Sequence, residues 1–341
     1  MLRFYFDECK YRRTAVNALT HSFIETNGIR LHITEKGEGK PVLLLHGFPE
    51  TSFSWRHQLD ALAEAGYHAI APDLRGYGLS DSPVEFHRYT ILDIMSDLIG
   101  LLDALNIRQV AVIGNDWGAN IAWQCVQIRP DRFHAIVALG VPFMARAPLM
   151  PSHLFPQNDQ TWFYTIYFSQ PLLAAQELEQ DISTSLKKIY FWASSEGSHN
   201  PEASHNPFSM LSKQDGLLGS LPLPDNRPKW LTQEDFEVFV NSFKKSGFSG
   251  GLNYYRNLDQ NWEQQGAFHD LKIKVPALYL VGEHDTGLAM PGMQQIIAEM
   301  PKFIANLQGS HIIPNSGHWL QQEAPDQVNQ KMIDFLHSLE S

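Results

Sequence analysis

Short apolar runs alternate with amphipathic segments along the first 142 residues of the chain. The run at 40–48 is continuously apolar, which is typical of parallel strands that are buried on both faces. The segments between the runs repeat their apolar residues at helical spacing. This alternation predicts an α/β fold in which helices cover a mostly parallel sheet. The predicted strands are 30–37, 40–48, 67–74, 109–116 and 133–142, and the predicted helices are 57–66, 90–107 and 117–130.

The alternation stops after Pro142. Residues 143–265 are rich in Pro, Ser, Asn, Gln, Tyr and Trp, and strands return only at 274–285 and 303–313, before a helix at 325–339. A sheet domain interrupted by an inserted, mainly helical cap explains this order better than two consecutive domains. The predicted organisation is an N-terminal extension (1–22), a first part of the core (23–142), a cap (143–265) and a second part of the core (266–341).

Composition excludes several classes of protein. The formal net charge of -11 argues against a nucleic-acid surface, which requires clustered Lys and Arg. The sequence has no apolar run long enough to span a membrane, and Asp7 and Glu8 interrupt the apolar patch at the N-terminus, unlike a secretory signal. We therefore expect a cytoplasmic protein. Cys9 and Cys125 are too few for a disulfide framework, and the scattered histidines predict neither a metal nor a cofactor.

The segment GNDWG, residues 114–118, lies between a predicted strand and a predicted helix. It fits the nucleophile elbow, G-x-nucleophile-x-G, in which small flanking residues permit a strained turn that exposes one side chain. Asp116 occupies the nucleophile position, where many hydrolases carry serine. Taken alone, an ordinary turn with Asp116 as the cap of the following helix explains the pattern equally well.

Three further motifs favour the elbow. HGFP, which begins at His46, follows a buried strand with a glycine turn, as in hydrolases that present a backbone N–H to an oxyanion. Asp285 follows a predicted strand, and His318 precedes the last predicted helix. Each of these residues has an alternative role. His46 would be a packing residue, Asp285 a turn former and His318 the cap of the helix that follows. Nucleophile, acid and histidine nevertheless stand in the order of the α/β-hydrolases, so we predict Asp116, Asp285 and His318 as catalytic residues.

Longer motifs carry a more specific resemblance. LLLHGFPE, APDLRGYGLSD, GNDWGANIAW, YFSQPLLAAQELEQD, NYYRNLDQNW and SGHWLQQEAP together resemble the soluble epoxide hydrolase family of α/β-hydrolases. The resemblance covers about residues 23–340. Two departures stand beside the nucleophile, where Asn115 replaces a more usual histidine and GAN replaces a more usual GG after Trp117.

An aspartate at the elbow has a chemical consequence. A carboxylate can displace a leaving group from a saturated carbon and form an alkyl ester on the enzyme, whereas a serine attacks carbonyl groups. In a second step His318 would deprotonate water, which attacks the ester while Asp285 orients the imidazole. The backbone N–H groups of Phe48 and Trp117 are the predicted oxyanion donors. The predicted substrates are therefore epoxides or alkyl halides, together with water.

The leaving group distinguishes an epoxide substrate from an alkyl halide. An opening epoxide develops an alkoxide that needs a proton donor, and tyrosine hydroxyls are suitable donors. The resemblance to the family implies that Tyr164 and Tyr255 open the ring. Their neighbours Tyr167 and Tyr254 leave the register open, and packing between cap and core is the alternative role of any of these side chains.

Two other functions are weighed against epoxide hydrolysis. Haloalkane dehalogenases commonly carry Asn where this chain has Phe48, and fluoroacetate dehalogenases carry Arg where it has Trp117. A binding module without turnover would tolerate loss of the catalytic residue types, yet all of them are present. The sequence therefore favours an epoxide hydrolase.

Aromatic and apolar residues crowd the predicted cap and elbow, which favours an apolar epoxide as the substrate. The sequence is compatible with a monomer or a homodimer. The residues predicted to contact the substrate are His46, Pro49, Trp117, Phe143 and Trp192.

Overall fold

The structure is a computed structural model that describes residues 18–200 and 208–340. Cys9 and most of the predicted N-terminal extension lie outside the described residues. The first strand, β1 (Thr20–Thr26), begins inside the range predicted as extension and pairs antiparallel with β2 (Ile29–Lys36). Most residues of β1 are exposed or partly exposed. The strand therefore has no continuous apolar run from which it could be predicted.

The described residues form an eight-stranded sheet in the order β1-β2-β4-β3-β5-β6-β9-β10. The pairs that involve β2 are antiparallel and the other pairs are parallel, which confirms the predicted fold class. All the predicted strands are present. Beyond β1 and β2 they are β3 (Lys40–Leu45), β4 (Tyr67–Pro72), β5 (Val110–Asn115), β6 (Phe133–Leu139), β9 (Ala277–Gly282) and β10 (Leu307–Ile313).

Helices cover both faces of the sheet, and successive side chains of a strand point to opposite faces. Leu43 and Leu45 of β3 belong to the apolar cluster that contains the side chains of α3 and α4. Val42 and Leu44 belong to a second cluster, with α2 and α16. A central strand such as β3 is thus apolar along most of its length because it is buried on both faces. These helices are α2 (Arg56–Glu64), α3 (Ile91–Ala104), α4 (Trp117–Ile128) and α16 (Pro325–Ser338).

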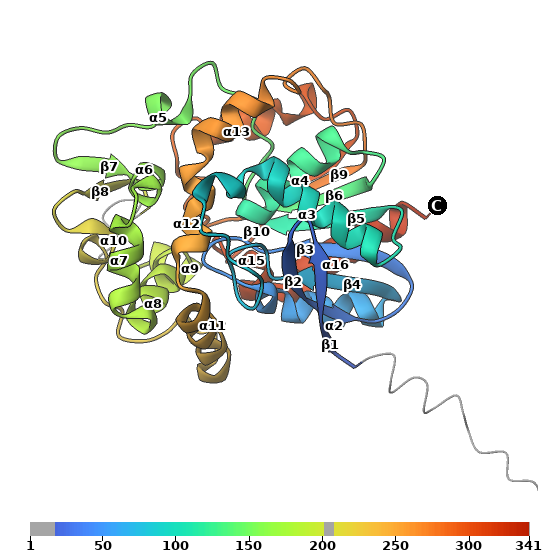
Figure 1. Cartoon of the computed structure of the whole chain (residues 1–341), viewed down its shortest axis with the longest axis horizontal. Helices are drawn as coiled ribbons and strands as arrows, with labels where there is room; N and C mark the ends of the chain where they lie inside the picture. Colours follow the sequence, from blue (N-terminus) through green and yellow to red (C-terminus); the bar gives the residue numbers. More distant parts are fainter. Residues whose placement is uncertain (1–17, 201–207, 341) are drawn as a thin grey trace, which may run out of the picture.

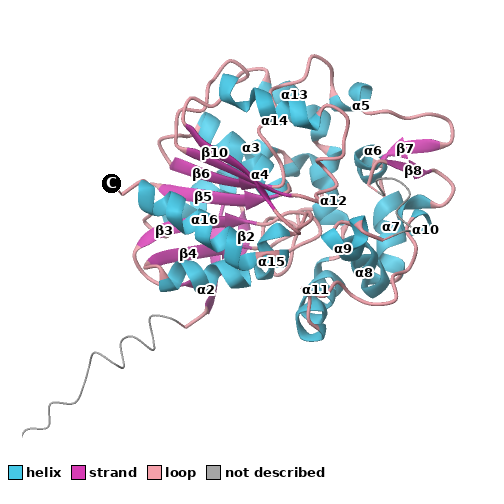
Figure 2. Ribbon diagram, turned by 180° about the vertical axis from the view of Figure 1, so that it is seen from behind, coloured by secondary structure: helices cyan, strands magenta, loops and turns pink. Residues whose placement is uncertain are grey.

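The segment between β6 and β9, which we call the insertion, forms a group of helices at one side of the sheet (Figures 1 and 2). A short antiparallel pair of strands accompanies the helices. Its described elements are α5 (Pro151–Leu154), β7 (Thr161–Phe163), α6 (Tyr164–Ser169), α7 (Leu173–Gln180), α8 (Ile182–Trp192), α9 (Ser195–Ser198), β8 (Met210–Ser212), α10 (Gly216–Ser220), α11 (Gln233–Ser246), α12 (Ser249–Arg256) and α13 (Leu258–Gln265).

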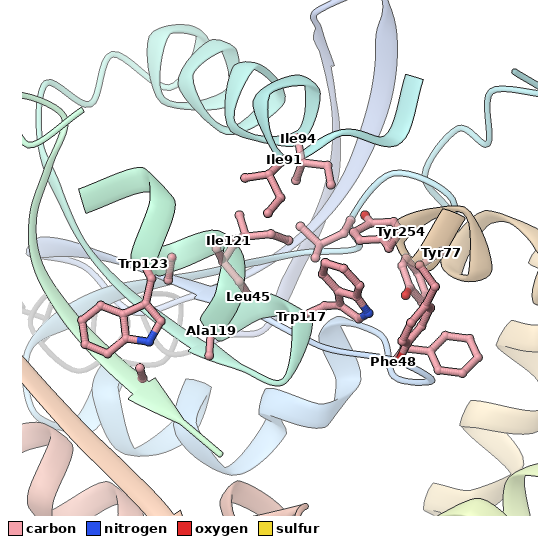
Figure 3. Packing of buried hydrophobic residues seen from close by; sticks show 14 of the residues in the cluster. Leu45, Phe48, Tyr77, Ile91, Ile94, Trp117, Ala119, Ile121, Trp123 and Tyr254 are labelled. Atoms are coloured by element: carbon pink, nitrogen blue, oxygen red, sulfur yellow. The ribbon is translucent and has the colours of Figure 1, made fainter. Parts of the chain in front are cut away.

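The apolar core is continuous from the sheet into the insertion. Trp117 of α4 and Tyr254 of α12 belong to one cluster, and their rings contact each other edge to face with centroids 5.6 Å apart. In Figure 3 the same cluster extends back to Ile121, which faces Ile91 and Ile94 of α3. The insertion therefore packs on the core through buried side chains next to the elbow.

Candidate active site

The elbow lies between β5 and α4, and its backbone has the strain expected of one. Asp116 has φ 53° and ψ -120°, a conformation that L-residues rarely adopt. A Cβ atom on Gly114 would lie 2.2 Å from the carbonyl oxygen of Gly118, and one on Gly118 would lie 1.9 Å from that of Leu45. Both flanking glycines are therefore needed to close the turn.

The alternative role of Asp116 as a helix cap is not supported. Its side chain makes no capping hydrogen bond to the described residues of α4. One carboxylate oxygen, Oδ1, instead accepts a hydrogen bond of 2.8 Å from the backbone N–H of Phe48. The N–H of Trp117 belongs to the first turn of α4, where backbone donors have no acceptor within their own helix. Of the two predicted oxyanion donors, the Phe48 N–H thus binds the Asp116 side chain, and the Trp117 N–H follows Asp116 directly in the chain.

His318 connects the two acidic residues. Its Nε2 lies 3.5 Å from Oδ2 of Asp116, and its Nδ1 lies 3.1 Å from Oδ2 of Asp285. The other oxygen of Asp285 accepts a hydrogen bond of 2.7 Å from the N–H of Gly287, which fixes the carboxylate. Burial lowers the pKa of His318, but the charges of Asp285 and Asp116 outweigh burial and hold this pKa well above its ordinary value. The two acidic neighbours therefore favour the protonated form of the imidazole.

Tyr164 at the start of α6 and Tyr255 in α12 both line the cavity that contains Asp116. Tyr167 and Tyr254 are buried and are not among the described residues that line it. The Tyr254 hydroxyl donates to a backbone carbonyl of the core, 3.0 Å away. The sequence left open which tyrosines face the site, and the cavity lining favours the predicted pair, Tyr164 and Tyr255.

The two cavity tyrosines share one electrostatic environment. Burial raises the pKa of each hydroxyl, and the nearby charge of Asp116 raises both further. The rings of Trp117 and Tyr255 pack edge to face, with centroids 5.1 Å apart. Tyr164 and Tyr255 thus keep their protons while Asp116 is ionised.

The cavity wall is mainly apolar, although Asn120, Thr165 and Thr286 also line it. It contains roughly 1180 Å³ of empty space, a value that includes its open mouth. A mainly apolar wall with a few convergent polar groups is typical of a small-molecule site. Its apolar lining includes Phe48, Pro49, Trp117, Val141, Met144, Phe155, Phe163, Phe168, Ile189, Leu258, Met290, Met293 and Trp319.

Two of the predicted substrate-contacting residues, Pro49 and Trp117, line the cavity. Phe143 and Trp192 are not among the described lining residues, and this corrects the prediction. Phe143 is buried against Trp123, with ring centroids 5.9 Å apart. Trp192 is buried as well, and its indole N–H donates to a backbone carbonyl 2.8 Å away. Both rings are therefore packed in the protein interior.

His46 is a third correction, because it is buried and is not among the described lining residues. Its Nε2 accepts the N–H of Leu74 at 3.0 Å, so Nδ1 carries the proton and donates to the carbonyl of Gly47 at 2.9 Å. Burial lowers the pKa of the ring, which favours this neutral form. His46 therefore shapes the loop that presents the Phe48 N–H.

The sequence analysis missed a buried acid beside the site. Glu50 is fully buried and accepts hydrogen bonds from the side-chain amides of Gln321, at 3.0 Å, and Gln322, at 2.7 Å. Burial raises its pKa to about 7, although the charge of His318 works in the opposite direction. Asn115 is also fully buried, and its side chain is one of the groups that lower the pKa of Glu50. An acid directly after the HGFP motif was the available signal for Glu50.

Two other features concern metals and membranes. Among the described residues, no group of three or more His, Cys, Asp and Glu side chains could hold a metal ion. Within the same part of the chain, every helix is too short or too polar to cross a bilayer.

A parallel sheet that gathers an elbow carboxylate, a histidine and a second acid defines an α/β-hydrolase. Residues 40–325 match the family described as alpha/beta hydrolase fold. The chain is 38% identical to Epoxide hydrolase A of Mycobacterium tuberculosis over 329 residues, or 95% of this chain and 99% of that protein. It is 38% identical to Epoxide hydrolase 3 of Siraitia grosvenorii over 325 residues, or 94% of this chain and 99% of that protein.

A solved structure of an epoxide hydrolase from an endophytic Streptomyces superposes with a TM-score of 0.89 at 36% identity, covering 94% of this chain and 96% of that one. The chain therefore belongs to the epoxide hydrolase family of the α/β-hydrolases and is a hydrolase, as its sequence predicts.

Proposed function

We propose that this enzyme hydrolyses apolar epoxides to vicinal diols through a covalent ester on Asp116. One observation carries the proposal: the elbow carboxylate and two tyrosine hydroxyls, Tyr164 and Tyr255, line the same apolar cavity. The relatives and solved structures that resemble the chain are themselves named epoxide hydrolases. In this proposal the insertion is a cap, because it supplies both tyrosines.

In the first step Asp116 attacks one carbon of the epoxide. The carbon–oxygen bond of the ring breaks, and the oxygen takes a proton from Tyr164 or Tyr255. Alkylation also removes the charge of Asp116, and this charge is one cause of the raised pKa of both tyrosines. The hydroxyls therefore become stronger acids as the alkoxide forms.

In the second step water attacks the carbonyl carbon of the ester, and His318 takes a proton from water. The ester carbon–oxygen bond then breaks, and the leaving diol oxygen takes that proton back from the imidazolium. The acid regenerated on Asp116 passes its proton to His318, which restores the ion pair of the free enzyme.

The charge of Asp116 helps to keep His318 protonated in the free enzyme. Since the ester is neutral, the pKa of His318 falls when it forms. The imidazolium then gives its proton to the tyrosine that was deprotonated in the first step, and the neutral ring can act as a base. Asp285 stabilises the imidazolium, and the N–H groups of Phe48 and Trp117 stabilise the oxyanion.

The proposal is tested with a panel of aryl epoxides, fatty epoxides and haloalkanes. We expect diol formation from the epoxides and no halide release. Repeated turnover in oxygen-18 water should place the label in the carboxylate of Asp116, because ester hydrolysis transfers one solvent oxygen to the enzyme. Label that is found only in the diol would overturn the ester mechanism, and halide release without diol formation would favour a dehalogenase.

A further inference from the structure

The short segment that carries His318 is held at three successive backbone N–H groups. Gly317 donates to Oε2 of Glu323 at 3.0 Å, and Trp319 donates to Oε1 of the same side chain at 3.1 Å. Between them, His318 donates to the carbonyl of Ala193 at 2.9 Å. One carboxylate therefore binds the peptide groups on both sides of the catalytic histidine.

The same carboxylate also binds the insertion. Oε2 of Glu323 accepts the N–H of Ser195, the first residue of α9, at 2.9 Å. The two backbones meet closely here, since a Cβ atom on Gly317 would lie 2.5 Å from the nitrogen of Ser195 and 2.8 Å from the oxygen of Ala193. Glu323 thus bridges the histidine segment and the start of α9.

Helix α8 contacts the opposite side of the site too. The hydroxyl of Tyr190 donates to the carbonyl of Pro49 at 2.6 Å, next to the Phe48 N–H that binds Asp116. The indole N–H of Trp319 donates to the backbone carbonyl of Tyr190 at 3.1 Å. The base and the oxyanion donor are therefore both fixed relative to this one helix.

We infer that Glu323 is a positioning residue that sets the place of the His318 ring through the backbone of Gly317 and Trp319. This inference rests on the proposed role of His318 as the base of ester hydrolysis. A carboxylate forms strong, charge-assisted bonds to N–H donors, and a displacement of about 1 Å at a reacting group can cost on the order of a hundredfold in rate. None of the hydrogen bonds of Glu323 involves Asp116, Tyr164 or Tyr255, so its effect should fall on the second step.

The test replaces Glu323 by glutamine and measures the two steps separately. An amide nitrogen cannot accept a hydrogen bond. Glu323→Gln therefore loses part of the hydrogen bonding to Gly317, Trp319 and Ser195 with little change in side-chain size. We expect single-turnover alkylation to stay within about twofold of the wild-type rate and ester hydrolysis to fall about ten- to a hundredfold. Intact-protein mass spectrometry should then detect accumulated ester.

The matched control is Glu283→Gln. Glu283 directly follows β9. Its carboxylate accepts one backbone N–H, that of Asn315, at 3.0 Å, a few residues before His318. This bond does not flank His318, so both steps should keep their wild-type rates. Glu323→Asp keeps the charge but retracts the oxygens, and it should also slow hydrolysis selectively. This second variant preserves the test if Glu323→Gln does not fold.

The outcomes separate this inference from the proposed function. If His318→Gln accumulates ester while both Glu323 variants hydrolyse it at the wild-type rate, the positioning role is wrong and the mechanism stands. Equal slowing of both steps in the Glu323 variants would likewise overturn the positioning role, because a general loss of structure affects alkylation as well. If no variant, His318→Gln included, forms an ester, the proposed mechanism itself is wrong.

Discussion

Nε2 of His318 lies 3.5 Å from Oδ2 of Asp116, while the other oxygen of that carboxylate already accepts the N–H of Phe48. In the proposed mechanism, the ion pair between the two side chains exists only until Asp116 is alkylated. The contact therefore links the protonation state of the base to the progress of the reaction, and this link can be measured.

Replacing Asp116 by asparagine should abolish turnover and lower the pKa of His318. The charge and hydrogen bond of Asp116 help to raise this pKa, and asparagine mimics the neutral ester in this respect. NMR titration of the imidazole would check the direction of the shift. The control is Asp60→Asn, because Asp60 is exposed and paired with Lys36. An unchanged His318 pKa in Asp116→Asn would contradict the proposed switch from acid to base.

Replacing His318 by glutamine should leave alkylation and stop hydrolysis. The nucleophile and the tyrosines remain, but no group accepts the proton of water. Mass spectrometry of the intact variant after incubation with an epoxide should find a stoichiometric adduct. Asp285→Asn should trap the adduct more weakly, since the ring stays but loses its orienting charge. Binding of the epoxide without any adduct would rule out this division of labour.

The sequence predicted the parts of the fold that depend on local pattern. Continuous apolar runs identified β3 and β5 because these strands are buried on both faces. β1 was missed because it lies at the edge of the sheet, where most of its side chains contact solvent. An edge strand is specified by its pairing with β2, and pairing cannot be read from the strand's own residues.

The site divides in a similar way. Asp116 follows from a turn that only flanking glycines allow, so a short motif was enough to find it. Phe143 and Trp192 were predicted from residue type alone, and residue type does not say which side of the cavity wall a ring occupies. Glu50 and Glu323 were missed because each acts through partners that depend on tertiary packing.

The buried acid Glu50 should make stability depend on pH. Its pKa is raised from 4.5 to about 7, so its contribution to stability is fully present below pH 4.5 and is lost as pH rises through 7. The shift corresponds to roughly 3 kcal/mol at most. In urea unfolding, Glu50→Gln should lack this fall between pH 4.5 and 7. Parallel profiles for the wild type and the variant would show that Glu50 titrates normally.

The cavity tyrosines have close neighbours that serve as internal controls. Tyr164→Phe and Tyr255→Phe should each slow alkylation by about a hundredfold, because one hydroxyl is lost from a transition state that develops negative charge on oxygen. Tyr254→Phe removes a hydroxyl one residue away that donates to the carbonyl of Arg75, and Tyr167→Phe removes one that does not line the cavity. Both controls should alkylate at the wild-type rate.

Stopped-flow measurement of single turnovers resolves alkylation from hydrolysis in these variants. The double variant of Tyr164 and Tyr255 should lose far more than either single one, since no acid remains to protonate the alkoxide. Ester hydrolysis should change much less, because His318 and Asp285 carry it out. If Tyr167→Phe or Tyr254→Phe slowed alkylation while the cavity pair did not, the register would shift to those residues. Epoxide opening at the wild-type rate without any of the four hydroxyls would reject acid catalysis by tyrosine altogether.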